Sequence, residues 1–294
     1  MTTTHVSGAL AAPHRCVFPA ALAVIATLAV WLTAAIADPV PPTSTGDITL
    51  PKDVRIDSLV LPDGTVAPGT VGFGVNANGV PVVADGTQLR VLGDTQTILD
   101  IAPRKIDDFS WMLAQQLLLI SGDRLISPGQ KGQLRELALP MNGMKVRRAS
   151  GSDAYIFGGA GETASHDLYL AKPSGKMIKL ASLPTPIADA SGFELDSYLA
   201  TGKRLLRIAK GRPVEIFLEA DADITSIAAA VAGGVYFSTS DGVSYANRRG
   251  SIFPFLPGFT GILRTDAVSL YVWNAAERRL LRIQGISSLE AVLN

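Results

Sequence analysis

The pentapeptide RLLRI occurs twice in this chain, at residues 204–208 and at residues 279–283, so that the two copies begin 75 residues apart. Self-similarity at a constant spacing is the signature of a repeat protein. If 75 residues hold two units, related features should recur about every 37 residues. Prolines that close a hydrophobic segment keep roughly this spacing or a multiple of it, and they are Pro103, Pro140, Pro184 and Pro257. The sequence therefore predicts an array of units of about 40 residues.

Each unit contains the same succession of short strands and glycine-containing turns. The second strand is the easiest to recognise, and its copies are residues 80–84, 117–121, 154–158, 197–201, 235–239 and 270–274. Four short strands in about 40 residues are typical of one blade of a β-propeller. We predict an all-β fold, a six-bladed β-propeller with four-stranded blades over residues 55–294, and find no helical periodicity. A β-sandwich or barrel is the alternative, although neither requires RLLRI to recur.

Closure of the ring has two candidate segments. Residues 55–62, RIDSLVLP, match the last strand of a unit without the three strands that should precede it. Such a strand can complete the final blade, so that the two ends of the chain share one sheet. Residues 286–293 could occupy the same position. Either five strands form that sheet or one of the two segments docks elsewhere.

The blade pattern resembles the six-bladed bacterial propellers of the TolB and NHL type over residues 55–294. The Gly-His and Trp-Asp pairs of WD repeats are missing, and the double glycine of kelch repeats does not recur. The resemblance therefore lies at the level of the superfamily, and no single family follows from it.

The N-terminus has the pattern of a signal peptide or membrane anchor. Arg15 is the one charged residue among the first 37, and an uncharged apolar run follows it over residues 16–37. Small residues at Ala35 and Ala37 predict cleavage after Ala37, but the run approaches the roughly 20 residues that span a bilayer, so an uncleaved anchor is the alternative. Residues 38–54 are predicted to form a Pro-rich linker. We therefore expect a periplasmic or extracellular domain, which contacts a membrane only if residues 16–37 remain attached.

Composition excludes several classes of function. Cys16 is the single cysteine, so a chain cleaved after Ala37 has no thiol for disulfides, catalysis or metal binding. The 26 basic side chains are balanced by 26 acidic ones, which argues against a nucleic-acid partner because binding phosphates needs surplus positive charge.

Catalytic motifs are also scarce, and we predict no catalytic residue. His166 is the only histidine beyond the N-terminal segment, and no G-x-S-x-G sequence is present to supply a nucleophile. His166 and Glu162 belong to an enlarged loop at residues 158–167, which makes the third unit longer than its neighbours. Extra loop length is frequently functional, so this loop is a candidate for specific contacts, although a flexible hairpin insertion would look the same.

The first strand of every unit should line the central channel. Its polar residues are Asn76, Asp107, Asp108, Arg147, Asp189, Ser191, Asp223, Ser226, Arg264 and Asp266. The candidate binding residues among them are Asp107, Arg147, Asp189 and Asp266. Carboxylates from different blades can bind Ca²⁺ through oxygen, and the chain is similar in blade number to gluconolactonase-type propellers. A solvated polar lining is the alternative.

Arginine pairs and aromatic residues are interpreted structurally. The pair Arg147–Arg148 and two later pairs are expected to be solvated strand edges that discourage association. Adjacent residues on a strand point to opposite faces, so a pair should not act as a unit. The aromatic residues are expected to pack between blades, and they are Trp111, Phe253, Phe255 and Trp273.

Two functional hypotheses follow from these observations. In the first, the propeller is an exported scaffold that binds a ligand, an envelope protein or a cell-wall component and needs no cofactor. In the second, it is a calcium-type metal-dependent hydrolase or lactonase that uses the channel carboxylates. The second hypothesis requires three or more oxygen ligands that converge on the axis, and the first requires none.

Overall fold

The computed structural model describes residues 50–62, 71–112, 116–129, 133–159, 166–194, 196–208 and 214–294. All of them belong to one compact unit, Pro39–Asn294. The predicted signal or anchor segment, most of the predicted linker and Glu162 lie outside the described residues. Within the described part of the chain, no helix is long and apolar enough to cross a bilayer.

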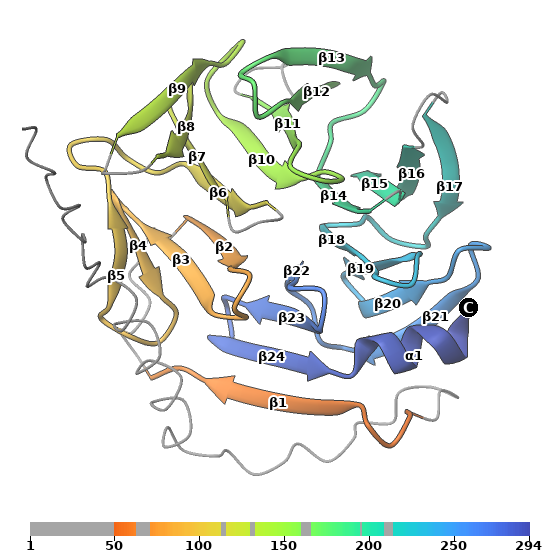
Figure 1. Ribbon diagram of the computed structural model, residues 1–294. Coiled ribbons are helices and arrows are strands. Elements are labelled where there is room, and N and C mark those ends of the chain that lie inside the picture. The colour runs from red at the N-terminus through yellow and green to blue at the C-terminus, as the bar shows by residue number, and fades with distance from the viewer. Residues whose placement is uncertain are drawn as a thin grey trace, which may run out of the picture. The chain divides into compact units, whose positions relative to one another are not determined.

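Six sheets of four antiparallel strands surround a central axis (Figure 1), which confirms the predicted six-bladed propeller. Blade 1 consists of β2 (Val71–Val75), β3 (Pro81–Asp85), β4 (Gln88–Val91) and β5 (Thr97–Asp100). Blade 2 consists of β6 (Asp108–Trp111), β7 (Leu117–Ser121), β8 (Arg124–Pro128) and β9 (Leu134–Ala138). Blade 3 consists of β10 (Met144–Arg148), β11 (Ala154–Gly158), β12 (Asp167–Ala171) and β13 (Met177–Ser182).

The remaining blades repeat this order. Blade 4 consists of β14 (Asp189–Phe193), β15 (Asp196–Thr201), β16 (Arg204–Ile208) and β17 (Glu215–Glu219). Blade 5 consists of β18 (Ser226–Ala229), β19 (Val235–Thr239), β20 (Gly242–Ala246) and β21 (Ile252–Pro257). Blade 6 consists of β22 (Ile262–Thr265), β23 (Ser269–Asn274), β24 (Arg279–Gln284) and β1 (Arg55–Val60).

The two RLLRI copies are the third strands of blades 4 and 6, namely β16 and β24. Consecutive leucines are buried in both, Leu205 and Leu206 in one and Leu280 and Leu281 in the other. Each blade packs against a neighbour on both of its faces, so residues that point to opposite sides of a strand are both withdrawn from water. The repeat is therefore a consequence of packing between blades.

Aromatic side chains contribute to this packing as predicted. The rings of Trp273 and Phe73, from blades 6 and 1, have centroids 6.2 Å apart. Phe255 is buried and packs against Tyr236 in the cluster between blades 5 and 6, with Phe253 partly buried beside it. Burial of apolar area of this kind is the main stabilising contribution in a domain without disulfides.

The ends of the chain close the ring in the last sheet. β1 pairs antiparallel with β24, with Arg55 opposite Gln284 and Val60 opposite Arg279, so the strand predicted from residues 55–62 completes blade 6 (Figure 1). Residues 286–293 are not a strand, and the prediction of no helix was wrong. They form α1 (Ile286–Leu293) because β1 already occupies the free edge of β24 and Gly285, at φ 74°, redirects the chain.

α1 packs against blade 5 (Figure 1). Ile286 and Leu289 are buried in the cluster between blades 5 and 6. Glu290 is also buried, and its carboxylate accepts hydrogen bonds from the backbone N–H of Ala232 (2.7 Å) and the hydroxyl of Tyr236 (3.1 Å). The helix thus satisfies its one buried charge through the turn and second strand of a neighbouring blade.

Candidate binding site in the central channel

One strand from each blade lines the channel, and these strands run in the same direction. They are β2, β6, β10, β14, β18 and β22, and each contacts the next around the ring. The hydrogen bonds between blades establish the direction, because Asp189 and Ser191 of β14 accept, in chain order, from the backbone N–H groups of Ile227 and Ala229 of β18. Asp108 of β6 accepts in the same way from the backbone N–H of Val146 of β10. Residues that precede these strands therefore lie at one end of the channel, and residues that follow them lie at the other.

Arg147 of β10 is buried between two carboxylates. Its Nη1 lies 2.6 Å from Asp108 Oδ2 and its Nε lies 2.8 Å from Asp189 Oδ1. The three residues are 9%, 5% and 1% exposed, so the expectation that Arg147 belongs to a solvated strand edge was wrong. Burial alone would lower the pKa of Arg147, but the two adjacent carboxylates reverse this effect and raise it. Arg147 is charged at every pH at which the protein is folded.

Asp189 of β14 in blade 4 connects Arg147 to two further blades, 5 and 6. Its Oδ2 accepts from the hydroxyl of Ser226 (2.8 Å), from the backbone N–H of Ile227 (3.1 Å) and from Arg264 Nη1 (3.2 Å). Burial alone would raise the pKa of Asp189, but the charges of Arg264 and Arg147, together with these hydrogen bonds, lower it to about 2. Asp189 is therefore a buried carboxylate that remains ionised.

Arg264 of β22 completes the circuit. Its Nε donates to the carbonyl oxygen of Phe73 in blade 1 (3.2 Å), and its Nη1 donates to its neighbour Leu263 (2.6 Å) as well as to Asp189. Burial, followed by repulsion from Arg147, lowers the pKa of Arg264 to about 10. The connected hydrogen bonds thus reach every blade, and two guanidinium groups lie close together at the axis.

Arg148 is the next residue of β10 and contacts the same space. Its Nε donates to the carbonyl oxygen of Gly192 (3.2 Å), its Nη2 donates to Thr265 Oγ1 (3.1 Å), and its guanidinium lies over the ring of Phe193. Burial lowers its pKa. Among the described residues, none places a carboxylate within ion-pair distance of Arg148. Adjacent arginines do act together here, contrary to expectation, because the inner edge of β10 is free and long side chains from both of its faces reach the channel.

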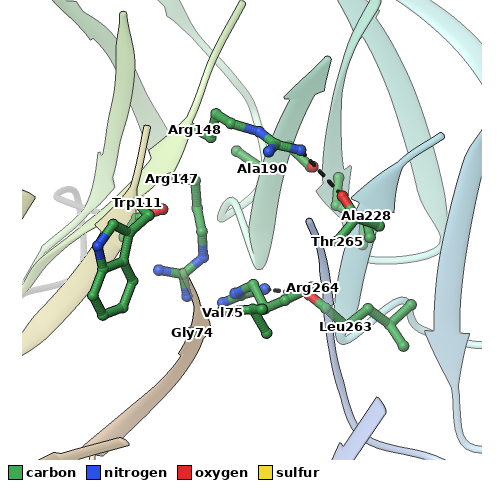
Figure 2. Close-up of a pocket in the computed structure, with 13 residues that line it drawn as sticks. Gly74, Val75, Trp111, Arg147, Arg148, Ala190, Ala228, Leu263, Arg264 and Thr265 are labelled. Carbon is green, nitrogen blue, oxygen red and sulfur yellow. Dashed lines mark hydrogen bonds between the residues drawn. The ribbon is translucent and has the colours of Figure 1, made fainter. Parts of the chain in front are cut away.

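The three arginines and Thr265 line a pocket of about 30 Å³ toward the end of the channel where the innermost strands finish. Trp111, Arg148 and Thr265 are the last residues of β6, β10 and β22. Figure 2 shows the indole of Trp111 on one wall and the side chains of Arg147 and Arg264 between the strands. Ser110 and Ser191 add hydroxyl groups to the lining, and the remaining wall is largely aliphatic.

The pocket has more positive charge and more donors than its own residues use. Among the described residues, three guanidinium groups and no carboxylate line it. Asp108 and Asp189 pair with Arg147 and Arg264 behind the lining, and the charge of Asp266 acts on Arg148 from outside it. Arg147 Nη2, Arg264 Nη2 and Arg148 Nη1 have no hydrogen-bond partner within the described ranges. Cationic donors in a confined space bind anions, so the arrangement is suited to a negatively charged group.

The other predicted site residues do not join this cluster. Asp107, before β6, accepts from the backbone N–H of Gly122, whereas Asp266, after β22, accepts from the backbone N–H of Ser269 and the hydroxyl of Tyr271. They lie at opposite ends of the channel, where each stabilises a turn. His166 contacts the carbonyl oxygen of Leu183 at the outer strands of blade 3. Of the predicted residues, the structure brings together Arg147 and Asp189.

The channel residues do not fit a calcium ion. Ca²⁺ takes six to eight oxygen ligands, but both oxygens of Asp189 already accept hydrogen bonds, two of them from guanidinium groups. In the described part of the chain, no three acidic, histidine or cysteine side chains are grouped as metal ligands. A cation at Asp189 would have to displace Arg147 and Arg264.

Sequence reasoning missed Arg148, Trp111 and Thr265 as pocket residues. Trp111 was assigned to packing between blades, and its ring does pack edge-on against Phe109, but it also lines the pocket. The position of two residue pairs could have indicated the pocket. Arg147–Arg148 and Arg264–Thr265 each end an innermost strand, and their two blades lie on opposite sides of the ring.

No protein-family model matches this sequence, and neither does any curated protein sequence. Solved propellers match its structure. A gluconolactonase from Xanthomonas campestris is 15% identical at a TM-score of 0.61, over 79% of this chain and 90% of its own. The calcium-binding protein regucalcin from Agrobacterium tumefaciens is 15% identical at 0.55, over 74% and 89%.

A virginiamycin B lyase from Staphylococcus aureus is 10% identical at a TM-score of 0.54, over 79% of this chain and 99% of its own. At such identities the similarity establishes the fold and leaves the chemistry open. The chain is therefore a six-bladed propeller of the architecture that gluconolactonases, regucalcin and virginiamycin B lyases share.

Proposed function

We propose that this protein is an exported ligand-binding propeller whose channel pocket binds an anionic group. The observation that carries the proposal is the set of nitrogens on Arg147, Arg148 and Arg264 that have no partner among the described residues, in a pocket whose described lining has three guanidinium groups and no carboxylate. Guanidinium nitrogens that face a small pocket from several sides favour an anion as their hydrogen-bond partner. An anion supplies those partners and offsets the repulsion between Arg147 and Arg264.

The site is organised for binding rather than for reaction. The guanidinium groups are held by backbone carbonyls of Phe73, Gly192 and Leu263, so their free nitrogens are oriented before a ligand arrives. Preorganised donors bind with a smaller loss of side-chain entropy. The pocket contains no histidine or cysteine, so it has neither of the side chains that most often act as base or nucleophile near neutral pH.

The cellular setting of the proposal comes from the N-terminal sequence. An apolar segment at residues 16–37, followed by a Pro-rich stretch, suits a propeller presented outside the cytoplasm on a tether. The acidic group would belong to a small molecule, an envelope protein or a component of the cell wall.

The second candidate is the calcium-type hydrolase or lactonase. Its support is that the propellers similar in fold include gluconolactonases and a calcium-binding regucalcin. Against it, the carboxylates of Asp108 and Asp189 are paired with arginines, so they are not free to hold a metal ion. Hydrolysis of glucono-lactone that depends on added Ca²⁺ would favour this candidate over the binding proposal.

The proposal is tested by anion binding to the purified full chain at constant ionic strength. Acetate, benzoate, phosphate and sulfate are titrated by calorimetry, with Arg148→Gln as the test variant. Arg249→Gln is the matched control, because Arg249 is an exposed arginine on the turn between β20 and β21 at the same end of the ring. We expect at least one anion to bind at one site per chain and to lose affinity in Arg148→Gln alone. Absence of binding by all four anions would overturn the proposal.

A further inference from the structure

We infer that the anion is a monocarboxylate whose carboxylate enters the arginine pocket and whose flat, apolar part rests on Trp111. This inference rests on the proposed function and specifies its ligand. Three properties of the pocket lead to it, namely its net charge, its size and its walls.

The charge of the pocket suits one negative charge better than two. Arg147, Arg148 and Arg264 line it, Asp108 and Asp189 pair with Arg147 and Arg264, and the charge of Asp266 acts on Arg148 from outside the lining. The surplus of positive charge therefore does not exceed one. A phosphate monoester, which carries close to two negative charges at neutral pH, would leave an uncompensated charge, which is costly in a buried site.

The size of the pocket favours a planar head group. A water molecule needs about 10–15 Å³ of such a cavity, so a pocket of about 30 Å³ suits a small head group such as a carboxylate better than a bulkier one. The free nitrogens belong to planar guanidinium groups, which match the two coplanar oxygens of a carboxylate. Nη2 of Arg147 and Nη2 of Arg264 approach from blades 3 and 6, so each can donate to one carboxylate oxygen.

The walls indicate what is attached to the carboxylate. Trp111 is the last residue of β6 and borders the pocket, and its ring is fixed edge-on against Phe109, with centroids 5.5 Å apart. Val75 and Ala190 also face the pocket and carry no polar side-chain groups. A fixed indole beside a cationic centre is suited to stack on a flat apolar group, which adds affinity beyond that of the ion pair.

The test compares probes that differ in one property. Benzoate and phenylphosphonate share the ring but differ in the shape and charge of the head group, and acetate keeps the carboxylate without the ring. Each is titrated by calorimetry at pH 8, where phenylphosphonate is mainly a dianion, into the full chain. We expect benzoate to bind more tightly than either of the other two probes.

Variants locate the binding. We expect Arg148→Gln to lower the affinity for benzoate about tenfold or more, since it removes a charged hydrogen-bond donor. Arg249→Gln should change the affinity for benzoate by no more than about twofold. Trp111→Leu should lower the affinity for benzoate about threefold to tenfold and leave the affinity for acetate unchanged. An unfolded variant would lose both affinities.

The outcomes separate this inference from the proposed function. If phenylphosphonate binds as tightly as benzoate and depends on Arg148, the pocket binds anions but the carboxylate assignment is overturned. Loss of benzoate and acetate alike in Trp111→Leu would overturn the role of Trp111. Binding of none of the probes would remove the proposed function itself.

Discussion

Asp189 is the residue at which the charges of the channel converge. Its two oxygens accept four hydrogen bonds, which come from Arg147, Arg264, Ser226 and Ile227. A buried ion pair contributes little net stability compared with apolar packing, but removal of one partner leaves the other charge buried and uncompensated. The stability of the propeller should therefore be sensitive to this side chain.

We predict that Asp189→Ala lowers the free energy of unfolding by about 3–5 kcal/mol. The substitution leaves two guanidinium groups without their carboxylate. Urea unfolding at pH 7 provides the measurement, with Asp223→Ala as the control, because Asp223 is exposed at a turn and should change stability by less than about 0.5 kcal/mol. Equal effects of the two substitutions would contradict this role of Asp189.

The pKa of Asp189 predicts a dependence on acid. Its folded value of about 2 lies below the ordinary 3.8, so the contribution to stability is complete above pH 3.8 and is lost as the pH falls toward 2. The contribution corresponds to roughly 2 kcal/mol. We expect the side-chain carboxyl resonance of Asp189 to remain that of the ionised form at pH 3, which carbon NMR would detect. A titration midpoint near pH 4 would show that the arginines do not lower the pKa of Asp189.

The first strand, β1, and the C-terminal helix, α1, both adjoin β24. β1 occupies the edge of β24, and Gly285 then turns the chain away into α1. Gly285 has a left-handed backbone, at φ 74°, and an added Cβ would lie 2.5 Å from the carbonyl oxygen of Asp53. The direction of α1 therefore depends on a position where both conformation and space require glycine.

Gly285→Ala should destabilise the protein by more than Gly175→Ala does. Gly175 also has a left-handed backbone, at φ 83°, but nothing lies within 4 Å of its added Cβ. The control therefore carries only the conformational cost of about 1 kcal/mol, and the difference between the variants reports the clash with Asp53. Thermal unfolding of both variants measures this difference, and equal melting temperatures would mean that the chain near Asp53 moves aside freely.

At the scale of the whole molecule, two features connect all six blades. Hydrogen bonds around the axis run from Asp108 through Arg147, Asp189 and Arg264 to Phe73, with Ser226 of blade 5 bound to Asp189, and the pairing of β1 with β24 closes the circumference. Open repeat arrays can unfold one unit at a time because each unit contacts only its neighbours. A ring that is connected at its centre and closed at its rim has no terminal unit to unfold first.

We predict that the blades unfold as one cooperative unit. Native-state hydrogen exchange followed by mass spectrometry should give the same highest opening free energy for amides in β7, β15 and β23, from blades 2, 4 and 6. Deletion of residues 1–62, which removes β1, should lower that value in β23 more than in β7. Independent values for the three blades in the intact chain would contradict the prediction.

The fold was largely predictable from local sequence, whereas the site was not. The second strand of every blade was predicted to within one residue at each end, because short apolar runs between glycine turns are a local signal. Helix α1 was missed because residues 286–293 are too few to show a clear helical period. Whether this segment could form a strand instead depended on whether β1 already paired with the edge of β24. Arg148 and Trp111 were assigned to other roles because strand alternation does not describe a strand with one free edge at the axis.

The sequence by itself determined the number of blades, the second strand of every blade, a candidate closing strand at residues 55–62 and the presence of arginines and aspartates on the innermost strands. Each of these depends on residues close together in the chain, such as the RLLRI copies and the turn glycines. Only the tertiary structure decided which charges pair and which remain free, because Asp108, Arg147, Asp189 and Arg264 come from four blades. Their distances, their burial and the cationic lining of the pocket arise when the ring closes and places them around one axis.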